Sequence, residues 1–378
     1  MLRITHHRRY TANHTWHLDY RNQQLFVKAN PHPDEARAER VGHARLRPYY
    51  PVPGLRSTSR IGRWTILVYE RWPHLAVDAG LLLDEITAAD RTGDQQRLDT
   101  CLTEILTHYR QTIARTLRHV PNAATITKLY ADRAAPGGRL DHYYQSDAPW
   151  PLTTKSRGLR PSQWAATRLV VNGRHHRLNF AELLTWLRSR LTPHRSVWAA
   201  ITQGDPTDVN IGWSPGSGPV WFDYDTGGLN ALPGEFACFL LYQRLHGAWL
   251  TPHQAPEAFR DHPSALDPAP LPSPAVRTEH HGSSLVIHYR HTPSPARQHV
   301  LRRYLTEIVA PCARRLGIED LMDWLRPYLV MRLLAVFPIA ELAPREAALS
   351  LALLAEALGP ATRLAGLLAL RPARTEAN

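Results

Sequence analysis

Residues 201–228 read ITQGDPTDVNIGWSPGSGPVWFDYDTGG, and this stretch decides the fold. Asp205 and Asn210 stand five positions apart and are followed by a turn rich in Gly and Pro. The apolar strand 219–222 then leads to Asp223 and Asp225. The stretch predicts two strand-like pieces that are joined by a tight reversal and carry carboxylates and an amide. Such oxygen ligands suit Mg²⁺ bound to substrate phosphates, so the sequence predicts phosphoryl transfer.

The spacing of these residues is more informative than their types. In kinase catalytic loops, the Asp that accepts the hydroxyl proton precedes a metal-binding Asn by five residues, and a second Asp on the next strand binds the bridging metal. Asp205, Asn210 and Asp223 stand in these relations. A hairpin of Asp, Asn and Gly on a solvated surface is the competing interpretation.

The pattern Gly-Asp-x-x-x-x-Asn, followed by an apolar strand ending in Asp-x-Asp, resembles the aminoglycoside phosphotransferase and choline kinase family, which is related to the protein kinases. The resemblance implies an α+β, bilobal protein-kinase-like fold with a small β-rich N-lobe and a larger, mainly helical C-lobe. The N-lobe is expected at residues 1–72 and the C-lobe at residues 73–378.

One position departs from the family. The Gly-Asp pair is usually preceded by His, and Gln203 takes that place here. The change leaves Asp205 intact but removes a residue that normally helps to orient the loop. Asp208 is expected to be a surface residue. A pseudokinase scaffold, which binds a peptide or partner without phosphoryl transfer, is therefore kept as an alternative of another class.

Lys28 is the candidate for binding the nucleotide phosphates. Basic residues here are almost all arginine, and Lys28 ends the apolar strand 25–29. A compact ammonium on a flexible stem suits phosphate oxygens in a way that a guanidinium does not. A kinase-like lobe also needs a glutamate on the next helix to hold this lysine. Glu39 is the first choice and Glu35 the reserve, with the alternative that both are solvated helix charges.

The rest of the N-lobe is predicted by pattern and by resemblance. Residues 4–27 read as two or three strands, and residues 34–46 as a helix that begins with acidic residues. The resemblance implies a nucleotide-covering loop at residues 10–14, which contain no glycine, and a hinge after the strand 64–68 whose main chain meets the adenine. The nucleotide-binding candidates are Arg8, Arg9, Asn13, Tyr69, Glu70 and Trp72.

The C-lobe is predicted to be helical from residue 81 onward, because apolar residues recur at spacings of three and four. A basic and aromatic insertion at about 128–177 is either an acceptor-binding surface or a partly buried insert. A Pro/His-rich excursion is expected at about 252–295, and residues 284–289 within it are predicted to form a strand. Helices return over residues 300–370.

Composition excludes several classes of protein. The chain has 378 residues and three cysteines without CxxC spacing, which argues against a disulfide framework or a zinc ribbon. No apolar segment follows the basic N-terminus, and charged residues and Pro338 interrupt the apolar C-terminal region. A cytoplasmic protein without a membrane partner is expected. The pI of about 9.9 suggests nucleic acid, but no recognition module appears.

The expected cofactors are ATP and Mg²⁺. Asp205 is expected to deprotonate the acceptor hydroxyl, Asn210 and Asp223 to bind Mg²⁺, and Asp225 to assist. A net charge of +12 would repel a polycationic acceptor such as an aminoglycoside. One branch of the resembled family phosphorylates Ser or Thr of precursor peptides in natural-product biosynthesis before a partner lyase acts. A peptide hydroxyl of this kind and a small-molecule antibiotic or metabolite both remain open as acceptor.

Overall fold

The computed structural model describes residues 2–6, 13–21, 23–72, 78–152, 158–260, 266, 273–281, 284–360 and 364–370. The chain forms two compact units. Unit 1 comprises residues 1–119, 198–235 and 245–271, and unit 2 comprises residues 120–197, 236–244 and 272–378. Residues 201–228 belong to unit 1. The predicted lobe boundary at residue 72 lies within unit 1 and stays a prediction.

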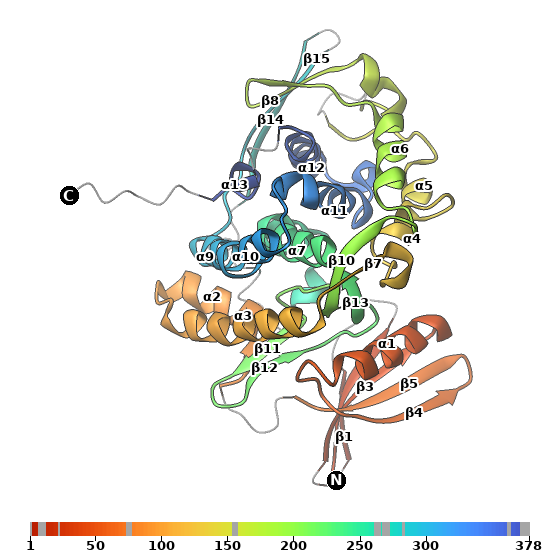
Figure 1. Cartoon of the computed structure of the whole chain (residues 1–378), viewed down its shortest axis with the longest axis vertical. Helices are drawn as coiled ribbons and strands as arrows, with labels where there is room; N and C mark the ends of the chain where they lie inside the picture. The colour runs from red at the N-terminus through yellow and green to blue at the C-terminus, as the bar shows by residue number, and fades with distance from the viewer. Residues whose placement is uncertain are drawn as a thin grey trace, which may run out of the picture. The chain divides into compact units, whose positions relative to one another are not determined.

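Unit 1 begins with a five-stranded antiparallel sheet in the order β1-β2-β3-β5-β4. The strands are β1 (Leu2–His6), β2 (His14–Tyr20), β3 (Gln23–Asn30), β4 (Leu55–Ile61) and β5 (Trp64–Glu70). Helix α1 (Pro33–Leu46) packs on this sheet (Figure 1). It starts where expected, because a proline fits the first turn and two acidic residues there complement the helix dipole.

The other elements of unit 1 include those formed by residues 201–228. Helices α2 (Leu82–Thr92) and α3 (Gln96–Thr116) pack side by side (Figure 1). Strands β11 (Ile211–Ser214) and β12 (Gly218–Trp221) form the predicted tight antiparallel reversal, and β6 (Gly80–Leu81) pairs with β11. Strand β13 (Gly228–Ala231) pairs with residues 199–202 of β10 (Ser196–Thr202). The hairpin places Asp223 just after a buried strand.

Unit 2 is mainly helical and contains one four-stranded sheet. Its helices and turns are η1 (Asn122–Ala124), α4 (Ala131–Ala134), α5 (Arg139–Tyr144), η2 (Pro161–Ala166), α6 (Phe180–Arg190), α9 (Pro295–Tyr304), η6 (Leu305–Val309), α10 (Ala310–Arg315), α11 (Leu321–Ala335), η7 (Ile339–Glu341), α12 (Pro344–Ala357) and α13 (Leu364–Leu367). Its strands are β8 (Arg168–Val171), β9 (Arg174–His176), β14 (Ala275–His281) and β15 (Ser284–Arg290). The sheet order β14-β15-β8-β9 joins the predicted insertion to the predicted excursion.

The aromatic residues of the predicted insertion are largely core. Trp150 and Trp164 are both 0% exposed and their ring centroids lie 5.5 Å apart. Tyr144 and Phe180 pack against Trp150. These rings are therefore not available as an acceptor-binding surface, and the alternative of a partly buried insert describes them.

The remaining elements are β7 (Arg118–Pro121), α7 (Leu232–Leu241), η3 (Tyr242–Leu250, a π-helix), α8 (Thr251–Gln254) and η4 (Pro256–Phe259). Within the described part of the chain, no helix has the length and apolar character that a bilayer span requires. The predicted α+β class is confirmed, because a β-rich N-terminal sheet is followed by a mainly helical chain.

Candidate active site

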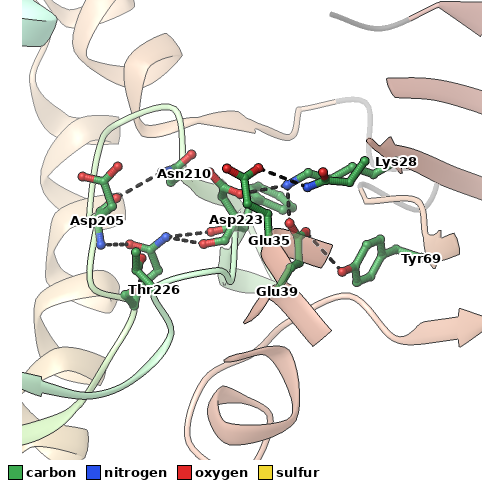
Figure 2. Close-up of polar contacts among 11 residues, drawn as sticks. Lys28, Glu35, Glu39, Tyr69, Asp205, Asn210, Asp223 and Thr226 are labelled. Atoms are coloured by element: carbon green, nitrogen blue, oxygen red, sulfur yellow. Dashed lines mark hydrogen bonds and ion pairs between the residues drawn. The ribbon is translucent and has the colours of Figure 1, made fainter. Parts of the chain in front are cut away.

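Three charged residues meet at the end of strand β3. Lys28 Nζ donates to Glu39 Oε2 on helix α1 and, over 2.9 Å, to Asp223 Oδ1 (Figure 2). Tyr69 on β5 donates its hydroxyl to the other oxygen of Glu39 over 3.2 Å. Glu35, one turn earlier on α1, instead accepts from Asn30 over 3.4 Å. The structure thus brings the first-choice glutamate, and not the reserve, to Lys28.

The three charged residues differ in how far they are buried. Glu39 is 3% exposed, whereas the side chain of Asp223 is 45% exposed. Burial acts to lower the pKa of Lys28, but the charges of Asp223 and Glu39 outweigh it, so the pKa of Lys28 lies above its ordinary value and the group stays an ammonium. Burial raises the pKa of Glu39 to about 7 against the opposing charge of Lys28. The site therefore offers a fixed cation beside a solvent-facing carboxylate.

Hydrogen bonds connect the loop that carries Asp205 to the segment that follows β12 and carries Asp223. Gln203 Oε1 accepts from the backbone amide of Asp205 over 2.7 Å. Asn210 Nδ2 donates to the Asp205 carbonyl over 3.0 Å, and the Asn210 carbonyl accepts from the Phe222 amide over 2.9 Å. Figure 2 shows Asn210 between Asp205 and Asp223. The three residues predicted from the motif therefore lie in one connected group.

Backbone geometry at the site is unusual at two positions. Asp223 has φ of +57°, in the left-handed region that non-glycine residues seldom adopt, although Asp tolerates it better than most. Gly204 has φ of +90°, and a Cβ there would lie 2.4 Å from the carbonyl oxygen of Thr226. Such strained conformations persist only where the surroundings hold them, and they concentrate at functional sites.

Glu235, near the start of α7, contacts the loop that precedes Asp205. It was not predicted as a site residue. It accepts hydrogen bonds from Thr202 Oγ1 (2.8 Å), the Gly204 amide (2.9 Å) and the Tyr109 hydroxyl (3.2 Å). It is 1% exposed, and burial raises its pKa to about 7. The signal that could have found it is a single acid in the apolar helix sequence LPGEFACFLL. A charged residue is seldom fully buried in an apolar helix unless it is paired with polar groups.

The side chains of the predicted hinge residues contact other groups of the protein. Tyr69 lies within β5, is 3% exposed and points its hydroxyl at Glu39. Glu70 binds the Gly54 amide over 3.1 Å and forms an ion pair with Arg56. The Trp72 ring lies 5.6 Å from that of Phe222. The side chain of Tyr69 therefore supports the Lys28 and Glu39 pair, and nucleotide contacts by the hinge stay a prediction.

Other predicted residues are placed less directly. Asn13 precedes His14, which pairs with Ala29 next to Lys28, so Asn13 lies at the Lys28 end of the sheet. Arg8 and Arg9 lie outside the described residues. Asp225 is half-buried, and its charge contributes to the raised pKa of Glu39. The prediction for Asp208 was wrong, because this residue is 0% exposed.

The residues fit a nucleotide-bound Mg²⁺ better than a protein-only metal site. In the described ranges, no group of three or more His, Cys, Asp or Glu could hold a metal ion. Mg²⁺ in phosphoryl-transfer sites typically takes one or two protein ligands together with phosphates and waters. The carboxylate of Asp223 and the amide of Asn210 would supply such a pair. The Lys28 ammonium would supply a positive charge for phosphate oxygens.

Comparisons with known proteins give similarity of fold only. No protein-family profile matches the sequence, and no curated protein matches it. Among solved structures, a thermostable mutant of aminoglycoside phosphotransferase APH(4)-Ia in its apo form has a TM-score of 0.41 at 12% identity, over 87% of this chain and 93% of that one. A putative aminoglycoside phosphotransferase from Ralstonia eutropha JMP134 has a TM-score of 0.40 at 13% identity, over 98% and 91%.

A microcompartment-associated aminopropanol kinase has a TM-score of 0.40 at 13% identity, over 98% of this chain and 94% of that one. At such identities and TM-scores, the likeness carries no weight for the chemistry of this chain. Any function must rest on the contacts of its own residues.

Proposed function

We propose that this protein is an ATP- and Mg²⁺-dependent phosphotransferase that transfers the γ-phosphoryl group to an alcohol hydroxyl. One observation carries the proposal: Lys28 contacts both Glu39, 11 residues away, and Asp223, 195 residues away. A lysine held by a helix glutamate and placed beside a metal-binding Asp is the arrangement that protein kinases use for phosphoryl transfer. A solvated surface hairpin would leave these residues apart.

Each residue has a separate task in this reaction. Lys28 binds phosphate oxygens, and Glu39 with Tyr69 keeps the ammonium in place. Asp223 and Asn210 hold Mg²⁺, which when bound neutralises charge on the phosphates. Asp205 orients the acceptor hydroxyl and accepts its proton as the oxygen attacks the γ-phosphorus and ADP leaves. The positioning of the reactants supplies most of the acceleration.

The acceptor is proposed only as an alcohol. The finer proposal of a Ser or Thr hydroxyl in a precursor peptide, with a partner lyase, rests on the net charge of +12. Part of that charge has internal partners, because Arg133 and Arg139 both donate to the Ala335 carbonyl at the end of α11. A small-molecule hydroxyl is proposed with equal standing.

Nucleotide binding can be tested by the melting temperature in the presence of Mg-ATP. The wild type should be stabilised, because a ligand that binds only the folded state raises its stability. The Asp223→Ala variant should be stabilised much less. The Asp205→Asn variant, which keeps the metal ligands, should be stabilised like the wild type but should transfer no phosphoryl group. No shift in the wild type would contradict the proposal and favour a scaffold.

The acceptor class can be found by mass spectrometry after incubation with Mg-ATP. A precursor peptide encoded beside the protein and a panel of aminoglycosides and amino alcohols are suitable acceptors. A mass increase of about one phosphate group should appear in one class, and Asp205→Asn should abolish it. An aminoglycoside product would contradict the charge-based expectation.

A further inference from the structure

A buried amide joins the two loops of the site. Gln203 is 0% exposed. Its Nε2 donates to the carbonyls of Phe222 (3.0 Å) and Asp223 (2.6 Å), and its Oε1 accepts from the amide of Asp205 (2.7 Å). One side chain thus touches the backbone at both Asp205 and Asp223. Every polar group of this amide has a partner at one of the two loops.

The contacts act on the strained part of the site. Asp223 is in the left-handed region, and the two carbonyls that Gln203 binds flank its peptide unit. A left-handed Asp turns its carbonyl away from the extended path of the strand, and a donor placed there offsets the cost of that conformation. The main chain of Gln203 is held as well, because its carbonyl accepts from Thr226 over 3.0 Å.

Building on the proposed phosphotransfer, we propose that Gln203 is a positioning residue that sets the place of the Asp205 base relative to the Asp223 metal ligand. Its side-chain amide is engaged with backbone groups, so we assign it no contact with the nucleotide or the acceptor. The backbone around this side chain presents one amide N–H, from Asp205, and two carbonyls. A side chain that pairs with all three needs one acceptor and donors for two carbonyls. A primary amide meets this requirement at every pH, since it does not titrate.

Two substitutions give opposite dependence on pH. In Gln203→His, the neutral imidazole offers one donor and one acceptor, whereas the imidazolium has donors only and opposes the Asp205 amide. Activity relative to wild type should fall wherever the imidazole becomes protonated toward low pH. In Gln203→Glu, the carboxylate would face two carbonyl oxygens, so relative activity should rise as the acid becomes protonated at low pH.

Other titrating groups around Gln203 affect all variants alike. Glu235 binds the next residue, Gly204, and Glu39 binds the Lys28 that contacts Asp223. Both have a pKa raised to about 7. Asp205, Asp208, Asp223 and Asp225 are the other acidic residues at the two loops. Ratios of variant to wild-type rates at each pH remove these shared titrations.

The experiment measures Mg-dependent ADP formation and Mg-ATP affinity between pH 5.5 and 8.5, with folding checked by circular dichroism. The matched control is Gln298→His, a 7% exposed glutamine of unit 2 whose Nε2 donates to the Pro293 carbonyl over 2.9 Å. It should give a flat ratio. Hydrogen exchange of the Asp205 amide should be faster in Gln203→Leu than in wild type, whether or not the enzyme turns over.

The outcomes separate the two proposals. Opposite slopes for the His and Glu variants, together with faster Asp205 exchange, support the positioning role. Wild-type turnover and unchanged Asp205 amide exchange in folded Gln203→Leu overturn the role of Gln203 and leave phosphotransfer standing. A wild type that neither binds nor turns over Mg-ATP overturns phosphotransfer, and the positioning role with it.

Discussion

Glu39 and Glu35 lie one turn apart on α1 but have different partners, and this difference makes a matched test. Glu39 holds Lys28, whereas Glu35 accepts from Asn30. In Glu39→Gln, the ammonium loses a charged partner, and a charge-assisted hydrogen bond contributes about 1.5–3 kcal/mol. We expect Mg-AMP-PNP to bind at least about tenfold more weakly by calorimetry, against less than about twofold for Glu35→Gln. Equal losses would show that the pair does not position the phosphates.

Glu235 predicts an unusual dependence of stability on pH. Its folded-state pKa of about 7 lies above the model-compound value of 4.5. Between these values the folded state keeps a proton that the unfolded state has lost, so raising the pH through this window favours unfolding. The contribution is fully present below pH 4.5 and is lost as the pH passes 7.

The test is the free energy of unfolding measured in urea at pH 5 and pH 8. The wild type should lose roughly 1–3 kcal/mol from this group over the interval. Glu235→Gln should show a smaller loss, because its amide can still accept from Gly204 and can donate to Tyr109. An unchanged loss in the variant would mean that Glu235 titrates normally.

At this scale, the sequence predicted residues that share a motif and missed those joined only by folding. Asp205, Asn210 and Asp223 could be recognised because their spacing is set within one short stretch. Glu235 and the hydroxyl of Tyr69 could not, since their tasks depend on partners that lie on other elements. Asp208 was misjudged because a loop motif does not reveal which of its acids faces inward.

At the scale of elements, a glycine allows α1 to pack closely against the segment that follows β12. A Cβ at Gly42 would lie 1.8 Å from the Tyr224 carbonyl oxygen, far inside contact distance. Only glycine lets the helix approach the residue that follows Asp223 so closely. The side chain of Leu46 approaches Gly227 in a similar way. The position of helix α1 thus determines where Glu39 contacts Lys28.

Gly42→Ala should therefore destabilise the protein, although Ala favours helices by about 1 kcal/mol over Gly. Because the clash is with backbone, α1 must shift, and we expect a net loss of roughly 1–3 kcal/mol together with weaker Mg-ATP binding. The control is Gly366→Ala in α13, where an added Cβ meets nothing within 4 Å. Urea unfolding measures both, and a stabilised Gly42→Ala would refute the close approach.

Strands and helices were predicted well where local pattern decides them. The reversal into β12, the strand of Lys28 and helix α1 all follow from alternation, turn residues and acidic first turns. The insertion could not be settled in this way. The sequence does not distinguish a buried Tyr or Trp from an exposed one. Only the packing in the structure shows that Trp150 and Trp164 are buried.

At the scale of the whole molecule, the described site residues all belong to unit 1, although the chain leaves this unit and returns to it. Mg-AMP-PNP alone should therefore slow hydrogen exchange in residues 23–46 and 201–228. Residues 158–177 of unit 2 should be unchanged. The Asp223→Ala variant should show little protection anywhere. Protection of unit 2 by the nucleotide alone would contradict this assignment.

The two-unit division itself could not be read from the sequence. The Asp and Asn motif indicated a kinase-like plan, but the strand pairing of β15 with β8 joins residues more than a hundred positions apart. No periodicity in either segment identifies the other as its partner. Long-range pairing of this kind is decided by the folded context of the strands.

The distance in sequence between Lys28 and Asp223 has a consequence for biosynthesis. A ribosome releases β3 and α1 long before the strand that completes the charge cluster, because 195 residues separate the two side chains. A nascent chain that ends near residue 200 contains Lys28 and Glu39 but not Asp223. Under the proposed function, translation would have to proceed beyond Asp223 before the nucleotide site is complete, so ATP would not assist the earliest folding of the N-terminal sheet.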